Sequence, residues 1–295
     1  AVKQGLATVR QRIAAVTKEA GCEEPCLVAV SKLMEIPTLM EAYNEGQRHF
    51  GENYVQEFCD KAPQMPQDIK WHFIGHLQSN KAKNLIKAVP NLYVVESVDS
   101  AKTATALNKA CDSVGRQDPL NVMVQVNTSS EESKSGCEPS EAPAVVQHIM
   151  RDCTKLKFTG LMTIGKLGDP NPEPYFKLLS EIREKLVAEL GLKDKVLLSM
   201  GMSGDYELAI RSGSNSVRVG SSIFGARPPK PSSPRGGGKG DVPSEKKPEA
   251  PAAASSVSAS ASEAGGLGSM FGGGIVTGVA IAAIAVGAFM ILRPR

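Results

Sequence analysis

The segment Leu27-Val-Ala-Val-Ser-Lys32 places four apolar residues directly before a serine and a lysine. A short apolar run of this kind predicts a buried strand that delivers Lys32 to its C-terminal end. A lysine there can lie against a desolvated pocket, where burial lowers its pKa and leaves a neutral amine able to form a Schiff base. A solvated lysine after a strand fits the same letters, so residues elsewhere in the chain must decide between the two interpretations.

Strand-like and helix-like segments alternate outward from this point, after an N-terminal amphipathic helix. The expected strands are 27–31, 49–51, 71–74, 92–95, 121–126, 157–162, 196–200 and 216–219, and the helices between them are 36–44, 53–61, 81–88, 101–112, 142–150, 175–190 and 205–211. Eight such units without a long insertion favour an α/β fold, a closed parallel (β/α)8 TIM barrel, with an open doubly wound sheet as the alternative. In a barrel the functional residues gather at the C-terminal ends of the strands, where Lys32 is expected.

Two turns rich in glycine and serine follow the last two expected strands. The first reads Gly201-Met-Ser-Gly-Asp205, and the second begins Gly220-Ser221. Backbone N–H groups at the start of a helix can hold an anion, and serine hydroxyls add donors. Barrels commonly bind phosphate after strands seven and eight. The paired turns therefore predict a phosphate site formed by Ser203, Gly204, Gly220 and Ser221.

Arg218 precedes the second turn by two residues and is expected to point toward the mouth of the barrel. There its guanidinium could face the ring nitrogen of a bound pyridine-type ligand. Because arginine stays protonated and is a poor proton source, a pyridine nitrogen beside it would remain largely unprotonated and act as a weak electron sink. A surface ion pair is the alternative interpretation of this arginine.

Six motifs together make the chain similar to the pyridoxal phosphate homeostasis protein family, over residues 1–225. They are AVSK (29–32), HFGENYVQE (49–57), WHFIGHLQSNK (71–81), GLM (160–162), LSMGMS (198–203) and VRVG (217–220). The resemblance implies a single barrel like the N-terminal barrel of alanine racemase, PLP fold type III. It also implies that pyridoxal 5'-phosphate (PLP) is the cofactor, bound without an established catalytic turnover.

The resemblance also implies roles for individual residues. Lys32 would form the Schiff base with PLP, Arg218 would face the pyridine nitrogen, and the two turns would surround the phosphate. Asn53 and Met200 are expected to line the cofactor, and no residue is assigned a catalytic role. The family often has threonine after the glycine of strand eight; this chain has Ser221, which keeps the hydroxyl.

Two pairs of polar residues could suggest a metal site or a pair of catalytic carboxylates, and neither interpretation is adopted. His72 and His76 are four residues apart, but they lie across a strand end and not on one helical face, so no metal site is predicted. Glu52 and Glu57 lie across a junction between a strand and a helix, where their spacing fixes no distance between carboxylates. They are interpreted as capping and surface groups.

Composition limits the partners and the compartment. The formal net charge is +3, and no basic stripe interleaved with aromatic residues occurs, so nucleic acid is not expected as a partner. Six cysteines are scattered without a paired spacing, which favours a reduced, cytosolic domain. Cys22 and Cys26, which flank a proline turn, are assigned a structural role. The polar segment Ala1–Ala20 does not resemble a secretory signal.

The composition changes after about residue 225. Residues 226–269 are rich in Pro, Gly, Ser and Ala and are expected to form a disordered linker. Residues 270–295 are expected to form a hydrophobic helix, because 275–292 are 18 uncharged residues, long enough to span a membrane. Such a tail anchor would leave the barrel in the cytosol, with the mitochondrial outer membrane as the expected site. The tail departs from the family pattern.

The expected function is a carrier or buffer in intracellular PLP homeostasis that passes PLP to apo-enzymes. A racemase needs acid–base groups on both faces of the α-carbon, and alanine racemase takes the second base from an additional β domain, for which this sequence has no segment. Two alternatives remain open. One is a racemase-like enzyme that uses Lys32, and the other is a membrane-tethered interaction module with structural PLP.

Overall fold

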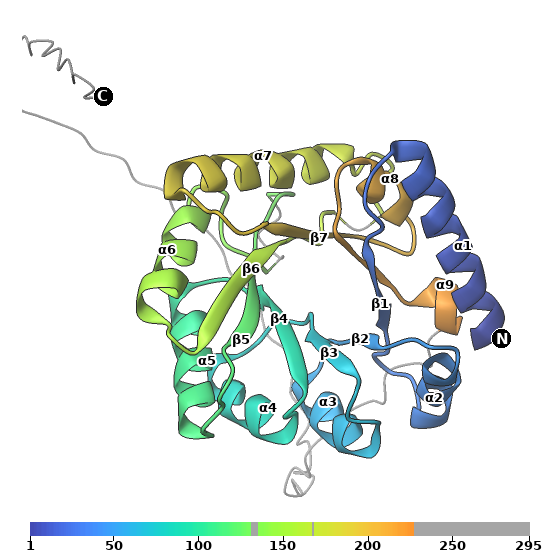
Figure 1. The fold of residues 1–295 in the computed structure, drawn as a ribbon, viewed down its shortest axis with the longest axis horizontal. Coiled ribbons are helices and arrows are strands. Elements are labelled where there is room, and N and C mark those ends of the chain that lie inside the picture. Colours follow the sequence, from blue (N-terminus) through green and yellow to red (C-terminus); the bar gives the residue numbers. More distant parts are fainter. Residues whose placement is uncertain (131–134, 167, 227–295) are drawn as a thin grey trace, which may run out of the picture. The chain divides into compact units, whose positions relative to one another are not determined.

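Eight parallel strands close into a barrel in the computed structural model, which describes residues 1–130, 135–166 and 168–226 (Figure 1). The strands are β1 (Cys26–Val30), β2 (His49–Glu52), β3 (Lys70–Phe73), β4 (Leu92–Val98), β5 (Leu120–Gln125), β6 (Leu156–Met162), β7 (Leu197–Met202) and β8 (Ser216–Val219). Each strand pairs with the next, and β8 pairs with β1, with Cys26 opposite Ser216. The closed barrel is confirmed and the open sheet is excluded.

Helices surround the barrel, and most follow the predicted segments. They are α1 (Val2–Ala20), α2 (Ile36–Asn44), α3 (Val55–Lys61), α4 (Ala82–Ala88), α5 (Ala101–Ser113), α6 (Ala142–Asp152), α7 (Glu173–Leu190), α8 (Tyr206–Arg211) and α9 (Ser221–Phe224). The short α9 was not predicted from the sequence. Helix α3 begins two residues later than expected because Tyr54 is extended, with φ −119° and ψ 118°, which leaves Asn53 in the loop after β2.

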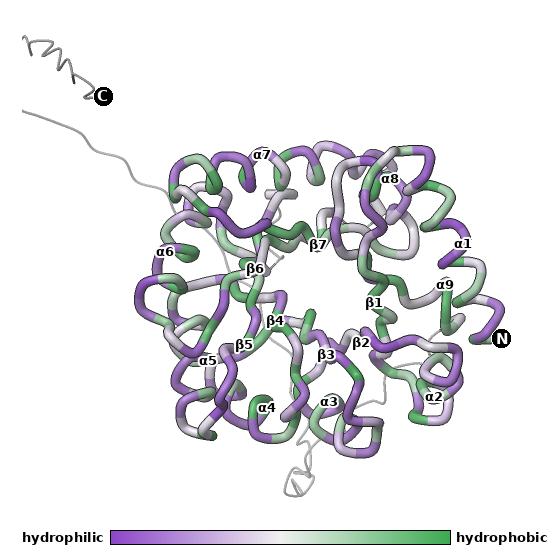
Figure 2. The backbone as a smooth tube through the Cα atoms, in the orientation of Figure 1, coloured by the Kyte–Doolittle hydropathy of each residue, from purple (hydrophilic) through white to green (hydrophobic). Residues whose placement is uncertain are grey.

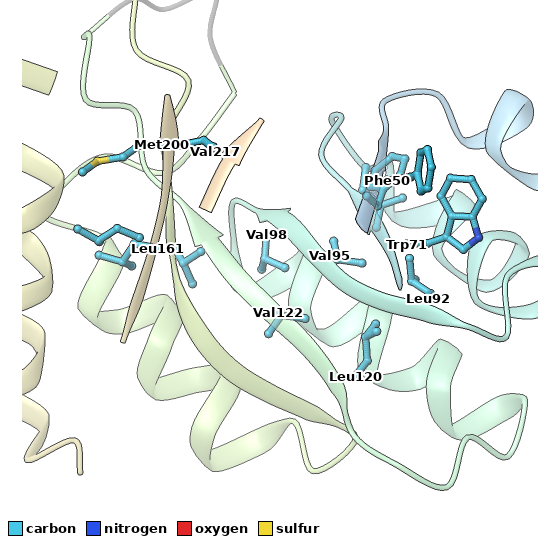
Figure 3. Close-up of a cluster of buried hydrophobic side chains, with 14 of the residues drawn as sticks. Phe50, Trp71, Leu92, Val95, Val98, Leu120, Val122, Leu161, Met200 and Val217 are labelled. Carbon is cyan, nitrogen blue, oxygen red and sulfur yellow. The ribbon is translucent and has the colours of Figure 1, made fainter. Parts of the chain in front are cut away.

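The main hydrophobic core lies between the strands and the helices. Side chains on the outer face of the barrel, among them Phe50, Trp71, Val95 and Leu161, are buried there (Figure 3). Figure 2 shows that the helices alternate between hydrophobic and hydrophilic positions, as expected when one face of each helix covers the barrel.

The inside of the barrel holds polar side chains. Ser199 on β7 donates a hydrogen bond to the Glu96 carboxylate on β4, with 2.5 Å between the oxygens. Strands β4 and β7 are not neighbours in the barrel, so this bond must cross the interior. Side chains alternate between the two faces of a strand, so the residue after an inward-facing one faces the helices.

Helix α1 packs along α8 and α9 (Figure 1) and depends on a glycine for its close approach to α9. A Cβ atom at Gly5 would lie 2.7 Å from the carbonyl oxygens of Ser222 and Ile223. These are backbone atoms, which can retreat only if α9 shifts.

Replacing Gly5 by alanine is therefore expected to lower the free energy of unfolding by about 1–3 kcal/mol, the usual cost of overpacking. The loss should appear although alanine favours a helix by about 1 kcal/mol over glycine. Urea unfolding measures it. The control is Thr8→Ala on the exposed face of α1, which should change stability by less than about 0.5 kcal/mol. A Gly5→Ala chain as stable as the native one would contradict the close packing.

The predicted linker 226–269, apart from Ala226, and the predicted membrane anchor 275–292 lie outside the described residues. Within the part of the chain that the structure describes, no helix combines the length and the apolar character needed to cross a membrane.

Candidate functional site

A cavity of about 850 Å³ lies at the C-terminal end of the barrel. Seven of the eight residues predicted for the site line it, and they come from the loops and strand ends of β1, β2, β7 and β8. These are Lys32, Asn53, Ser203, Gly204, Arg218, Gly220 and Ser221. The structure therefore brings together residues that are separated by up to 189 positions (221 − 32) in the sequence.

Met200 is the predicted residue that the structure places elsewhere. Its side chain is fully buried in the core between barrel and helices (Figure 3), and Met202 lines the cavity instead. The reason is the alternation along β7: Ser199 faces the barrel interior, so the next residue faces the helices. The pairing of β7 with β8 then shifts its register between Ser199 and Met202.

The turn that carries Lys32 has a strained backbone and is held from both sides. The residue after it, Leu33, has φ 64°, an uncommon conformation for a residue other than glycine. Its N–H donates to Oε1 of Glu57 at 2.5 Å. On the other side, Nζ of Lys61 donates to the carbonyl oxygen of Ser31 at 2.8 Å. Strain of this kind persists where the surroundings fix it, as happens at functional sites.

Lys61 joins two carboxylates beneath this turn. Its Nζ lies 2.9 Å from Oε1 of Glu52 and 2.6 Å from Oε1 of Glu57. Glu52 is fully buried, and burial raises the pKa of its carboxyl against the opposing effect of Lys61. The interpretation of Glu52 and Glu57 as capping and surface groups was wrong. Because α3 begins at Val55, Glu57 and Lys61 stand four residues apart on one face of the helix, next to the end of β2.

The two glycine and serine turns are hydrogen-bonded to each other. Oγ of Ser203 accepts from the N–H of Gly220 at 3.2 Å. Within the first turn, Oδ1 of Asp205 accepts from the N–H of Met202 at 2.6 Å, so this carboxylate orders the backbone there. Gly220 is buried and precedes α9, while Ser221 is exposed. The turns form one connected rim along the cavity.

Arg218 is buried at the base of the cavity. It donates from Nη1 to Oγ of Ser199 at 2.6 Å and from Nη2 to the carbonyl oxygen of Thr163 at 2.7 Å. Oε2 of Glu96 lies 4.0 Å from Nη1. Burial lowers the pKa of the guanidinium, and the Glu96 charge opposes that effect. The alternative of a surface ion pair is excluded, since both charged side chains are almost fully buried.

Asn53 shows that the cavity is suited to a polar ligand. Its Oδ1 is buried and has no hydrogen-bond partner within the described residues. An unpaired buried acceptor costs free energy unless a ligand or water satisfies it. The loop after β3 passes close to the backbone of Asn53: a Cβ atom at Gly75 would lie 1.9 Å from the carbonyl oxygen of Asn53. A lysine, hydroxyls and an arginine together fit an anionic ligand with a reactive carbonyl, and the Asn53 oxygen would accept from a donor group of that ligand.

The two histidines with a four-residue separation do not share a site. His72 is buried inside the barrel, where its Nδ1 lies 2.5 Å from Oε1 of Glu96. The side chain of His76 is 56% exposed and lies near Asp99.

Comparisons with known proteins agree with this geometry. The family model for the N-terminal domain of alanine racemase matches residues 5–228. A pyridoxal phosphate homeostasis protein of Schizosaccharomyces pombe is 54% identical over 207 residues, which cover 68% of this chain and 84% of the relative. PipY of Synechococcus elongatus, solved with PLP bound, is 31% identical with a TM-score of 0.64, and the match covers 76% of this chain and 100% of PipY.

Alanine racemases share the fold more distantly. The enzyme of Clostridium difficile is 17% identical with a TM-score of 0.57. That match covers 77% of this chain but 58% of the racemase, so a large part of the enzyme has no counterpart in the matched region. At this identity the likeness shows the fold alone.

Proposed function

Because this chain belongs to the family of pyridoxal phosphate homeostasis proteins, we propose that it binds PLP in the cavity at the C-terminal end of the barrel and acts as a carrier or buffer of PLP. One observation carries the proposal. Lys32, Arg218 and the paired serine and glycine turns, each predicted separately from the sequence, line a single cavity.

Different residues would hold different groups of PLP. The bound cofactor supplies an aldehyde that condenses with a lysine amine and a phosphate that carries negative charge. Lys32 provides the amine, on a turn fixed by Glu57 and Lys61. Ser203 and the backbone around Gly220 would hold the phosphate, and Arg218, which stays protonated, would lie beside the ring nitrogen.

A carrier is favoured over a racemase by the extent of the matches. The match covers the whole of PipY but little more than half of the racemase. Racemisation needs acid–base groups on both faces of the substrate's α-carbon. The described residues form the barrel that would bind the cofactor. The part of the racemase outside the match has no counterpart among them.

The test follows turnover and transfer in the same preparation. The pure, PLP-loaded protein is incubated with single amino acid enantiomers, and chirality and keto-acid formation are followed. We expect no sustained turnover. We also expect the loaded protein to reactivate a PLP-dependent apo-enzyme while a phosphatase destroys free PLP. Sustained turnover that disappears in the Lys32→Ala chain would overturn the carrier function, and so would reactivation no better than that by free PLP.

We also propose that the barrel works in the cytosol and that residues 275–292 anchor it to an intracellular membrane. The mitochondrial outer membrane is the membrane we propose. The support is the run of 18 uncharged residues in the sequence. Carbonate extraction of cells that express the full chain is the test. Retention in the pellet is expected, and release into the supernatant would exclude a spanning anchor.

The Ser203→Ala chain should bind PLP more weakly by roughly tenfold or more. A hydrogen bond to a charged group contributes about 1.5–3 kcal/mol, and the substitution also removes the acceptor of the Gly220 N–H. Equilibrium dialysis of PLP measures the change. Ser222→Ala is the matched control, because Ser222 is exposed in α9 and does not line the cavity. Equal affinities of the two variants would remove Ser203 from the phosphate site.

A further inference from the structure

Three side chains that can bind a metal ion meet inside the barrel, away from the PLP cavity. Cys26 begins β1, His49 begins β2, and His72 lies in β3, three neighbouring strands (Figure 1). One ligand atom from each lies within 4.8 Å of the others. Nδ1 of His49 faces Nε2 of His72 at 2.8 Å. Strand starts lie at the N-terminal end of a parallel barrel, and none of the three residues lines the cavity.

We propose that Cys26, His49 and His72 bind one zinc ion. A thiolate with two imidazoles is a donor set that zinc accepts, with a fourth position left to water. Bond lengths of about 2.0–2.1 Å to nitrogen and 2.3 Å to sulfur place tetrahedral donors roughly 3.3–3.6 Å apart. The two histidine nitrogens, 2.8 Å apart, would separate by roughly half an ångström to reach this spacing. The Cys26 sulfur lies within 4.8 Å of both nitrogens, so it would approach them by no more than roughly 1.5 Å.

A buried carboxylate already orients one of the ligands. Nδ1 of His72 lies 2.5 Å from Oε1 of Glu96, and Glu96 is in turn held by the Ser199 hydroxyl. A histidine that donates its Nδ1–H to a carboxylate keeps the lone pair of Nε2 for a metal, and metal-bound histidines commonly have such a partner. The negative charge of Glu96 also favours a cation nearby. The arrangement therefore prepares His72 as a ligand, with Nε2 directed at His49.

The other two ligands are half-buried, so an ion can reach them from the N-terminal end of the barrel. The ring of His49 lies against those of His72 and Tyr93, and Tyr93 is exposed.

Cys26 has to lose a proton to bind zinc. Burial, with a further contribution from Glu96, raises the pKa of the Cys26 thiol to about 12. On binding, the sulfur–hydrogen bond breaks, the proton passes to water, and the sulfur electron pair forms the bond to zinc. The hydrogen on Nδ1 of His49, which points at Nε2 of His72, moves through water to Nε2 of His49, so that Nδ1 can bind the ion. The ammonium of Lys70, over the Tyr93 ring, is the opposing positive charge at this end.

The experiment uses the full chain, freed of metal, and two probes. Equilibrium dialysis against zinc is expected to give one tightly held equivalent per chain. Cobalt(II), bound in place of zinc, is expected to give a thiolate-to-cobalt charge-transfer band in the near ultraviolet, recorded as a difference spectrum so that bound PLP does not contribute. Cys26→Ser should lose the band, and His49→Gln should bind zinc at least tenfold more weakly.

Two control variants test whether zinc binds at this site and not at other cysteines or histidines. Cys22→Ser removes an exposed cysteine four residues away, and His76→Gln removes the exposed histidine; both should bind zinc and cobalt as the native chain does. PLP loading should be unchanged in Cys26→Ser, so failure here is distinct from failure of the proposed PLP site. Less than one tight equivalent of zinc in the native chain, or a charge-transfer band that survives in a folded Cys26→Ser chain, would overturn the proposal. If Cys26→Ser does not fold, an unchanged zinc affinity of the His49→Gln chain would overturn the proposal.

Discussion

The Lys32→Ala chain should lose nearly all of its retained PLP, together with the visible absorption of the loaded protein. Lys32 lines the cavity on a turn held by Glu57 and Lys61, and alanine has no amine to condense with the aldehyde. Without the covalent bond, PLP should leave during gel filtration. Absorption spectra before and after filtration measure the retained fraction.

A second lysine at the cavity supplies the control. Lys166 also lines the cavity but is exposed in the loop after β6. The Lys166→Ala chain should therefore keep its absorption. Circular dichroism should show both variants folded. A Lys32→Ala chain that keeps its visible absorption, or a Lys166→Ala chain that loses it, would place the covalent bond on a residue other than Lys32.

Replacing Lys61 by methionine should destabilise the protein by about 3–5 kcal/mol, because it leaves the buried Glu52 without its cation. The turn before Lys32 also loses the hydrogen bond to the Ser31 carbonyl, so PLP should dissociate faster from the chains that remain folded. Urea unfolding and the rate of PLP loss during dialysis measure the two effects.

Two further variants separate charge from packing. Lys83→Met, at an exposed position of α4, should change stability by less than about 0.5 kcal/mol. The double variant Glu52→Gln with Lys61→Met removes both charges and should be more stable than Lys61→Met alone. If the double variant is no more stable, the loss does not come from an unpaired buried carboxylate.

The barrel could be predicted from the sequence because its evidence is local. Short apolar strands alternate with amphipathic helices, and the turns after β7 and β8 carry their own glycines and serines. Residues at the ends of parallel strands share one end of a barrel, so the topology alone places Lys32, Asn53 and Ser203 near one another. The one residue misplaced, Met200, lies within a strand, where a register shift decides which side chain reaches the cavity.

Contacts between distant elements could not be predicted in this way. The pairing of Lys61 with Glu52 depends on where α3 begins, and the extended Tyr54 sets that position. The bond between Glu96 and Ser199 crosses the barrel between strands that are 103 residues apart at these positions. Sequence spacing contains no signal for either contact. The same holds for Cys26, His49 and His72, whose spacings match no metal motif.

The position of the covalent bond to PLP tests the proposed binding site most directly. The native full chain is loaded with PLP, reduced with borohydride, digested, and its peptides are analysed by mass spectrometry. One pyridoxyl adduct is expected, on Lys32. An adduct on Lys166 or any other lysine in place of Lys32, or no adduct in the loaded protein, would contradict it.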